Sequence, residues 1–517
     1  MNRAARIRSA ALDGTLGRIV EIEADISNGL PNTTLVGLPD ASVAQARDRC
    51  RAAVVNSGHS WPSNRLTINL APSSLPKTGS HYDLGIALSV LAASGMINPD
   101  ALVGVLAVGE LALDGRLRPV AGVLPATHAG QQANCKTVIV PWANAAEAQL
   151  VVEVKVLAAK SLAHAVALLT GEDEPIDEPI VEVAPDPVFA LAPPVQGDFA
   201  DVIGQSEARV AMIVAAAGGH HVSLVGPPGV GKTMLAARLP SLLPDLNRQE
   251  ALEVSTIHSV AGLLTSSMPL IERPPFLDPH HTASAAAIVG GGSKVIRPGA
   301  MSLAHRGVLF LDEAPEFASN VLDALRQPLE SGRVVVSRAA QTVAYPARFQ
   351  LILAANPCPC GSGDDCQCSV SLRRKYHHRI SGPIRDRIDI HRELTKPARG
   401  SSLISSTKTS AHLAELVAQA RARQAHRYQG TPWKLNAEVD ASIMIRKWPL
   451  DQSVRRVLDS HIRSNSLSPR GADRVARLAW TIADLAGSGK PGVDDISTAL
   501  ALRKSTTLTG QIVDLVA

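Results

Sequence analysis

The stretch HVSLVGPPGVGKTMLAARL, residues 221–239, decides the fold of this chain. Its first five residues have the pattern of a buried strand, and MLAARL at its end has the pattern of a helix. Between them, Gly226–Thr233 matches GxxxxGK(S/T), the pattern of a glycine-rich loop that leads from a strand into a helix. Strand, loop and helix in this order predict a P-loop α/β domain.

Each part of this loop has a predicted task in holding the phosphates of ATP. The glycines let successive backbone N–H groups point at the β-phosphate. Lys232 neutralises the β/γ oxygens, and the Thr233 hydroxyl coordinates Mg²⁺. We therefore expect ATP and Mg²⁺ as cofactors. The nucleotide-binding residues are Gly226, Pro227, Pro228, Gly229, Val230, Gly231, Lys232 and Thr233.

A second apolar strand ends in two carboxylates. In GVLFLDE, residues 307–313, Asp312 comes at the carboxyl end of the strand, where it can hold the Mg²⁺ ion. Glu313 would then polarise the attacking water as the general base. The next apolar strand, residues 349–355, ends in Asn356, whose amide can orient that water or can simply end the strand ahead of a proline. We therefore predict a catalytic site that includes Lys232, Asp312, Glu313 and Asn356.

The composition limits the other properties of the chain. A length of 517 residues suggests two to four domains. The net charge of +4 neither requires nor excludes a nucleic-acid partner, so any such site must be local. The first residues carry no apolar run of signal-peptide length, and no apolar run approaches the length of a membrane span. We expect a cytoplasmic protein without a membrane partner.

An acidic segment divides the chain. Residues 171–200 contain eight acidic residues, six prolines and neither Lys nor Arg, which is typical of a solvated linker. Residues 1–170 alternate strand-like and helical runs and should form an α/β or α+β layer. Residues 201–397 hold the P-loop and the strands that follow it. Residues 398–517 predict a helical subdomain, with helical patterns at 410–428, 451–465, 471–486 and 493–503.

Further segments carry a resemblance to a known family. They are PHHT (279–282), GGG (290–292), PGAMSLAHRGVLFLDE (298–313), NPCPCG (356–361) and SGPIRDRIDI (381–390). With the P-loop and the helical tail, the chain resembles the YifB/ComM family of magnesium-chelatase-like AAA+ ATPases over almost its whole length. The resemblance implies an AAA+ module with a helical lid.

The same resemblance implies an assembly that shares its active sites. Arg387 is then the arginine finger that reaches the nucleotide of a neighbouring subunit, and Arg470 is sensor 2, with Arg474 as the competing candidate. The alternative for Arg387 is an ordinary surface ion pair. The expected assembly is a homo-hexameric ring.

The first 170 residues resemble the proteolytic domain of Lon-type proteases, which has an S5 domain 2-like fold. The segments that carry this resemblance are 77–86, 108–122 and 137–144. On the Lon pattern the nucleophilic serine falls on Asp83 and its lysine partner on Ala126. Because both catalytic groups are missing, we expect an α+β domain that is not a protease.

Two segments are candidate DNA contacts. The stretch SGRVVVSRAAQTVAYPAR, residues 331–348, predicts a β-hairpin with Arg338 near its tip, where it can follow a phosphate backbone. A solvated hairpin with an ordinary arginine is the alternative. The second segment combines Arg373, Arg374 and Lys375 with a tyrosine; it fits a nucleic-acid contact and equally a solvated basic turn at a subunit interface.

Four of the six cysteines crowd into eleven positions. Cys358 and Cys360 form one CxC pair, and Cys366 and Cys368 form another across the turn-rich GSGDD. Four thiolates in one loop can form a structural Zn²⁺ site, although zinc more often favours CxxC spacing. Reversible disulfides and reduced thiols are the alternatives.

The resemblance to the YifB/ComM family, together with the Arg338 hairpin and the basic segment after the cysteines, implies a DNA motor. A hexameric ring would hydrolyse ATP to move along single-stranded or branched DNA and drive branch migration of incoming DNA in recombination. The alternative is a chelatase-like ATPase that remodels proteins without a DNA substrate. An ATP-dependent protease is disfavoured by Asp83 and Ala126.

Overall fold

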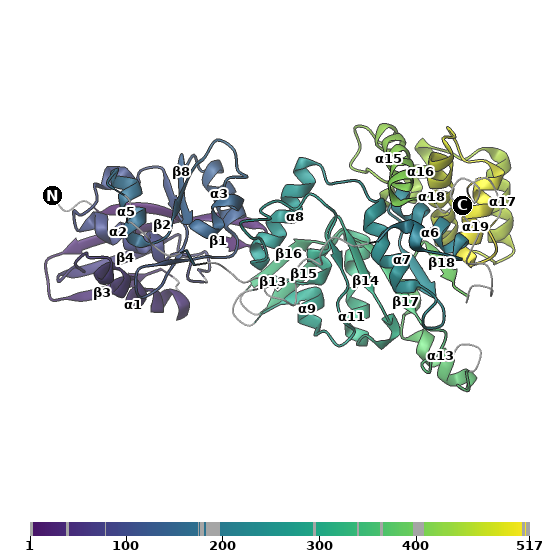
Figure 1. The fold of residues 1–517 in the computed structure, drawn as a ribbon, viewed down its shortest axis with the longest axis horizontal. Coiled ribbons are helices and arrows are strands. Elements are labelled where there is room, and N and C mark those ends of the chain that lie inside the picture. Colours follow the sequence, from purple (N-terminus) through teal and green to yellow (C-terminus); the bar gives the residue numbers. More distant parts are fainter. Residues whose placement is uncertain are drawn as a thin grey trace.

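The computed structural model describes residues 4–37, 41–77, 79–173, 175, 180–181, 197–292, 296–338, 341–361, 366–395, 408–508 and 512. The N-terminal domain and the C-terminal helices lie at opposite ends of an elongated molecule, with the P-loop domain between them (Figure 1). Most of the predicted linker at 171–200 lies outside the described residues, as do Ala339 and Ala340 of the predicted hairpin. None of the described helices is long and apolar enough to cross a membrane.

A seven-stranded mixed sheet forms the centre of the N-terminal domain. Its strands are β1 (Ala5–Asp13), β2 (Leu16–Ser27), β3 (Asn32–Val36), β4 (Arg65–Ala71), β5 (Val105–Ala107), β8 (Thr137–Pro141) and β9 (Lys155–Ala159). Their order in the sheet is β3-β4-β2-β1-β5-β8-β9. Strands β1, β2 and β4 pair antiparallel, whereas β5, β8 and β9 continue the sheet in parallel from β1.

Helices cover both faces of this sheet. They are α1 (Ala41–Asn56), α2 (Asp83–Ala93), α3 (Val123–Gln132), α4 (Ala145–Ala148) and α5 (Leu162–Thr170). Alternate side chains of β1 enter different cores: Ile7 packs with α1, α2 and α5, and Ala10 packs with α3 and α4. A small ribbon of β6 (Glu110–Leu111) and β7 (Leu117–Arg118) lies outside the main sheet. The prediction of a mixed α/β layer is confirmed.

The P-loop domain contains a five-stranded parallel sheet. Its strands are β10 (Val222–Val225), β11 (Phe276–Leu277), β14 (Val308–Leu311), β17 (Gln350–Ala355) and β18 (Ile390–Glu393). The order is β11-β14-β17-β10-β18, and all neighbours are parallel. Every residue of β14 and β17 is buried, as expected of a parallel sheet covered on both faces. The carboxyl ends of the strands therefore meet at one edge, beside the P-loop.

Helices and short elements surround this sheet. The helices are α6 (Ser206–Gly218), α7 (Lys232–Arg238), α8 (Arg248–Ala261), α9 (Ala285–Val289), α10 (Ala300–Leu303), α11 (Ser319–Ala324), α12 (Arg326–Ser331), α13 (Val370–His378) and α14 (Gly382–Arg385). A two-stranded ribbon joins β12 (Gly290–Gly291) to β13 (Arg297–Pro298). The predicted hairpin is formed by β15 (Arg333–Arg338) and β16 (Gln341–Pro346), in which Arg338 pairs with Gln341 next to the turn.

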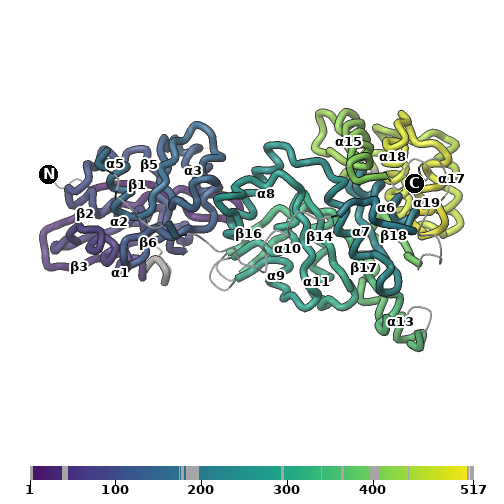
Figure 2. The backbone as a smooth tube through the Cα atoms, in the orientation of Figure 1, coloured from purple at the N-terminus to yellow at the C-terminus, as the bar shows by residue number. Residues whose placement is uncertain are grey.

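The described residues 408–508 form helices joined by turns and loops, without a strand. The helices are α15 (Ser410–Arg427), α16 (Ala441–Lys447), α17 (Gln452–Arg463), α18 (Pro469–Ala486) and α19 (Val493–Lys504). Helices α15, α17, α18 and α19 share one hydrophobic core with α6 and the P-loop strand β10, whereas Met444 of α16 packs in a separate cluster with Tyr428, Val439 and Trp480. Figure 2 shows this bundle packed against one end of the P-loop domain. The prediction of a P-loop α/β domain with a helical C-terminal part is confirmed.

The N-terminal domain contacts the P-loop domain at α8 and at the hairpin (Figures 1 and 2). The Gly122 N–H donates to Ser259 O (2.8 Å), and the Ser259 hydroxyl donates to Glu147 Oε2 (2.6 Å). At the hairpin, Gln341 Nε2 donates to Asp13 Oδ1 (3.4 Å). The buried Glu147 carboxyl thus lies at the junction of two domains, and burial raises its pKa to about 7.

Candidate nucleotide-binding site

The P-loop connects β10 to α7 as the sequence predicts. Gly229 (φ 76°) and Gly231 (φ 98°) have left-handed backbone conformations, which side chains with a Cβ rarely adopt. A Cβ at Gly226 would lie 2.7 Å from Leu394 O, so this position too needs glycine. Two backbone conformations and one close contact thus explain why glycine occupies these three positions of the loop.

Lys232 and Asn356 meet at this loop although 124 positions separate them. Lys232 Nζ donates to Asn356 Oδ1 (3.0 Å), to Gly226 O (2.6 Å) and to Pro227 O (3.0 Å). The lysine is largely buried, and burial lowers its pKa, while the nearby Asp312 and Glu313 carboxylates oppose that shift. The ammonium group is therefore held by three oxygen acceptors at the place where phosphate oxygens are expected.

Thr233 and Asp312 form the second part of the site. The Thr233 hydroxyl donates to Asp312 Oδ2 (2.7 Å), and the Glu313 N–H donates to Asp312 Oδ1 (2.8 Å). An alcohol and a carboxylate at this separation are hard oxygen ligands of the kind that Mg²⁺ prefers. The residues present therefore fit a magnesium ion held by Thr233 and Asp312.

Glu313 has a partner that the sequence analysis did not assign. Its backbone is left-handed (φ 49°), and its Oε2 lies 3.3 Å from His281 Nδ1. The imidazole of His281 packs against His280 (4.1 Å between ring centroids) and against the edge of Phe317 (6.5 Å). His281 belongs to PHHT, a segment that contributed to the family resemblance but for which the sequence indicated no function. The usable signal is that PHHT begins two positions after the last residue of β11, the parallel neighbour of β14, the strand that Glu313 follows.

The structure places the predicted arginines outside this cluster. Arg387 donates to Pro383 O (2.5 Å) and forms an ion pair with Glu330. Within one subunit, Arg387 therefore forms the ordinary ion pair that was the alternative to an arginine finger. Arg470 is an exposed residue at the start of α18. Arg474 pairs with the buried Asp389 (3.0 Å), so its guanidinium already has a structural partner. This pairing favours Arg470 over Arg474 as the sensor 2 candidate.

Asp83 and Ala126, at the Lon-like catalytic positions, are both buried. Asp83 forms a bidentate pair with Arg49 (2.8 and 3.1 Å) and accepts from the Leu111 N–H (3.3 Å). Burial raises the pKa of Asp83 to about 6, although Arg49 opposes the shift. The Arg49 pair ties the Asp83 carboxylate into the packing of the domain, and the neighbouring Cys50 thiol donates to Asp83 O (3.3 Å).

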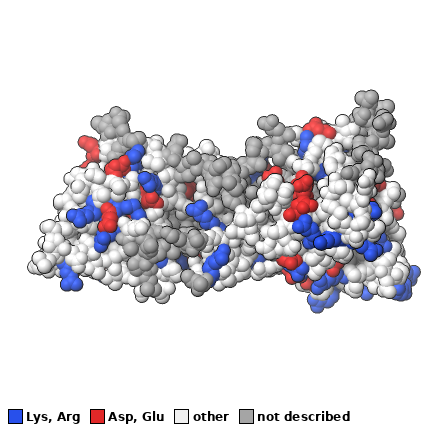
Figure 3. Space-filling model, turned by 90° about the horizontal axis from the view of Figure 1, so that it is seen from below, with Lys and Arg blue, Asp and Glu red and all other residues white. Residues whose placement is uncertain are grey.

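The candidate DNA contacts lie on exposed surfaces. Arg338 is exposed at the end of β15, and Arg373, Arg374 and Lys375 are exposed on α13. Helix α13 projects from the lower side of the molecule in Figure 1. In the view from below, Lys and Arg side chains gather over the half of the molecule that carries this helix (Figure 3).

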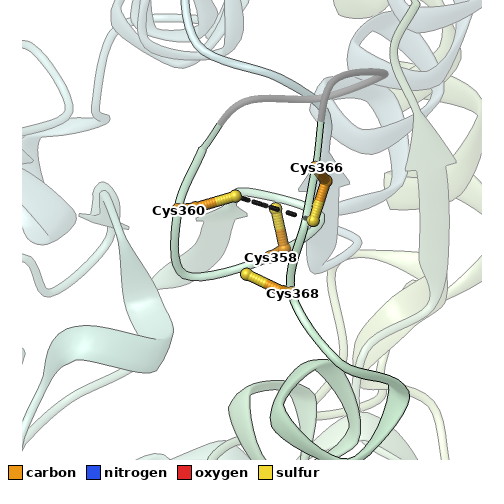
Figure 4. Close-up of side chains that lie close together, drawn as sticks. All are labelled: Cys358, Cys360, Cys366 and Cys368. Atoms are coloured by element: carbon orange, nitrogen blue, oxygen red, sulfur yellow. Dashed lines mark hydrogen bonds between the residues drawn. The ribbon is translucent and has the colours of Figure 1, made fainter.

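The cysteines also come together. Cys358, Cys360, Cys366 and Cys368 place their Sγ atoms within 4.8 Å of one another (Figure 4). The group lies between Asn356 and α13, next to the nucleotide site in the chain.

Comparisons with known proteins agree with this geometry. Residues 198–401 match the family model for "Magnesium chelatase, subunit ChlI"; residues 22–144 and 407–503 match those for "Subunit ChlI of Mg-chelatase" and "Magnesium chelatase, subunit ChlI C-terminal". Rv2897c of Mycobacterium tuberculosis is 47% identical over 97% of this chain and 98% of its own length.

Two named relatives are similar over comparable lengths. YifB of Escherichia coli is 41% identical over 90% of each chain, and the competence protein ComM of Haemophilus influenzae is 39% identical over 98% of each chain. The chain therefore belongs to the YifB/ComM family of magnesium-chelatase-like AAA+ ATPases.

Proposed function

We propose that this ATPase is a hexameric motor that moves along single-stranded or branched DNA in recombination. The observation that carries the proposal is the convergence of Lys232, Thr233, Asp312, Glu313 and Asn356 at the carboxyl edge of β10, β14 and β17. Such a site is built for phosphoryl transfer to water. In the proposed motor this reaction drives movement along the bound DNA.

The residues divide the work of hydrolysis. Lys232 binds phosphate oxygens, and Thr233 and Asp312 hold Mg²⁺, which when bound neutralises charge on the phosphates. Glu313 accepts a proton from the attacking water, and Asn356 orients that water. The Lys232 ammonium donates a hydrogen bond to the Asn356 amide oxygen. Phosphate binding must weaken this bond, because the ammonium then also binds phosphate oxygens.

The ring completes the site. Arg387 lies outside its own subunit's cluster, in the turn that follows α14, so as an arginine finger it acts on a neighbour. To do so it exchanges its pairing with the exposed Glu330 for the γ-phosphate of the adjacent subunit. This makes hydrolysis depend on assembly. Arg470 contributes from the lid as sensor 2.

DNA is the proposed partner. Arg338 lies next to the turn of the β15–β16 hairpin, and helix α13 carries the exposed Arg373, Arg374 and Lys375. Exposed cations on a hairpin and on a helix suit a sequence-independent phosphate contact. The similarity to ComM, which is named a competence protein, supports DNA as the polymer. A DNA motor of this kind would work in the cytoplasm.

ATP and Mg²⁺ are the cofactors of the motor, with a Zn²⁺ ion in the four-cysteine loop as a structural addition. The N-terminal domain is proposed as a non-proteolytic, S5 domain 2-like scaffold, because Asp83 is bound by Arg49 at the place of the nucleophile. The second candidate function is a chelatase-like remodeller of proteins. It rests on the match to the magnesium-chelatase 38 kDa subunit of Rhodobacter capsulatus, 28% identical over 31% of this chain.

The test is ATP hydrolysis by the purified protein with single-stranded, branched and duplex DNA. The motor predicts stimulation by single-stranded or branched DNA, and Lys232→Ala provides the background rate. Equal rates with all DNA forms and without DNA would favour the remodeller.

A further inference from the structure

Four sulfur atoms converge from two short segments that flank GSGDD. Figure 4 shows the side chains of Cys358, Cys360, Cys366 and Cys368 pointing into one small volume. Cys358 Sγ lies 3.2 Å from Cys360 Sγ, and Cys360 Sγ lies 3.6 Å from Cys366 Sγ. All four atoms lie within 4.8 Å of one another.

These separations fit a tetrahedral ion. With a Zn–S bond of about 2.3 Å, the edges of a tetrahedral site made by four thiolates measure about 3.8 Å. The observed sulfur separations lie around this value. A disulfide requires about 2.0 Å. A polynuclear iron–sulfur cluster would hold the cysteine sulfurs farther apart, because several irons stand between them. The geometry therefore suits a single ion with soft thiolate ligands.

The turn that carries Cys358 and Cys360 lies beside the P-loop at Gly361. Cys358 comes two positions after Asn356, and a Cβ on Gly361 would lie 3.2 Å from Pro228 Cγ and 4.0 Å from Asn356 Nδ2. Gly361 itself has a left-handed backbone (φ 70°). The turn that carries the first two cysteines thus touches both the loop predicted to bind phosphate and the amide predicted to orient water.

The second pair of cysteines ties the same turn to α13. Cys368 lies two positions before Val370, the first residue of α13, and His377 on that helix contacts Pro357 O through its Nε2 (2.9 Å). An ion shared by the two CxC pairs would hold the ends of this segment together, from Asn356 to the base of α13. Of these four cysteines Cys358 alone is buried, so the surrounding protein shields the group from solvent only in part.

We propose that Cys358, Cys360, Cys366 and Cys368 bind one Zn²⁺ ion, and that this ion fixes the turn which positions Asn356 at the P-loop. The link to Asn356 rests on the proposed role of that residue in ATP hydrolysis; the metal site does not. Asn356 is the residue that contacts Lys232, and the cysteines act on the reaction only through it. Loss of zinc should therefore lower kcat for ATP more than it changes KM.

The metal content of the full-length protein tests the site. We expect about one zinc per chain after purification under reducing conditions, and Co²⁺ in its place should show the intense thiolate-to-cobalt absorption of a tetrahedral sulfur site. The variant Cys366→Ser/Cys368→Ser should lose both, whereas Cys135→Ala, which alters a buried cysteine of the N-terminal core, should keep both. Absence of zinc from the unaltered protein, together with absence of the cobalt bands, overturns the proposal.

ATPase kinetics test the link. The double serine variant should retain its KM for ATP and lose at least severalfold in kcat, with Cys135→Ala unchanged. If that variant does not fold, the single change Cys360→Ser at an exposed position provides the same comparison. Zinc loss with an unchanged kcat overturns the link to Asn356. A protein that binds zinc but shows no ATPase activity in any form contradicts the proposed motor and leaves the metal site standing.

Discussion

His281 Nδ1 lies 3.3 Å from Glu313 Oε2, so a side chain from the segment after β11 holds the carboxylate that follows β14. The two strands are parallel neighbours, and their carboxyl ends bring PHHT and the Asp-Glu pair to the same edge of the sheet. The predicted general base is thus oriented by a residue 32 positions earlier in the chain.

This contact predicts a positioning role for His281. His281→Phe keeps a ring against His280 and Phe317 but removes the nitrogen that faces Glu313. Both side chains are partly exposed, and a contact of this kind contributes about 0.2–1 kcal/mol, so kcat should fall roughly 1.5- to 5-fold with little change in KM.

His281→Asn is the matched variant, because its amide nitrogen can occupy the place of Nδ1. It should restore much of kcat. Equal rates for the Phe and Asn variants would show that the contact is only packing. In a Glu313→Gln background neither change should have a further effect.

Substitutions of Lys232 and Glu313 should impair different steps of the ATPase reaction. Lys232→Ala should abolish ATP binding, because the phosphates lose their cationic ligand. Glu313→Gln should bind ATP and hydrolyse it about 10²- to 10⁴-fold more slowly, because the general base is lost. Equilibrium binding of a labelled nucleotide and single-turnover hydrolysis separate the two. Normal turnover in Glu313→Gln contradicts its assignment.

Arg387 is predicted to act on a neighbouring subunit. Separate Arg387→Ala and Glu313→Gln proteins should both be inactive. Mixing them should restore part of the ATPase activity, because an intact Glu313 in one subunit meets an intact Arg387 from the next. Arg385→Ala, an exposed arginine two positions earlier, is the control and should remain active alone. Failure of the mixture to recover would count against a finger in trans.

Arg338 is predicted to contact DNA phosphates. Arg338→Ala should weaken single-stranded DNA binding and reduce the salt slope by about 1, because one phosphate contact is lost. Arg333→Ala, at the opposite end of β15, should change neither quantity. Fluorescence anisotropy at several salt concentrations measures both. If the salt dependence of DNA binding were the same for the two variants, Arg338 would not contact DNA phosphates.

Glu147 predicts a pH dependence of stability. Its pKa is raised from 4.5 to about 7 in the folded protein, so the folded state binds an extra proton between these values. The stabilisation is present below pH 4.5 and is lost as the pH rises toward about 7, with an upper limit of roughly 3 kcal/mol at 1.36 kcal/mol per pKa unit.

Glu147→Gln should flatten this decline, because a neutral amide replaces the protonated acid between Asn144 and Ser259. Denaturant unfolding from pH 5 to pH 8 compares the two proteins. A variant whose free energy of unfolding falls with pH as steeply as that of the unaltered protein would rule out Glu147 as the source.

Much of the fold follows from local patterns that the chain carries in its sequence. The P-loop, the apolar strands that end in Asp312 and Asn356, the β15–β16 hairpin and the C-terminal helices each depend on residues within one short segment. Periodicity and turn residues report such segments directly, because they reflect which face is buried and where the backbone must turn.

By itself, the sequence therefore determined the elements, the glycine loop and the set of polar residues at the strand ends. Only the tertiary structure decided which of them meet: His281 with Glu313, Arg474 with Asp389, and Glu147 with Ser259 across the domain junction. The physical reason is that a pattern reveals that a side chain needs a partner, whereas the partner is chosen by how strands and helices pack. Sequence neighbours do not record that packing.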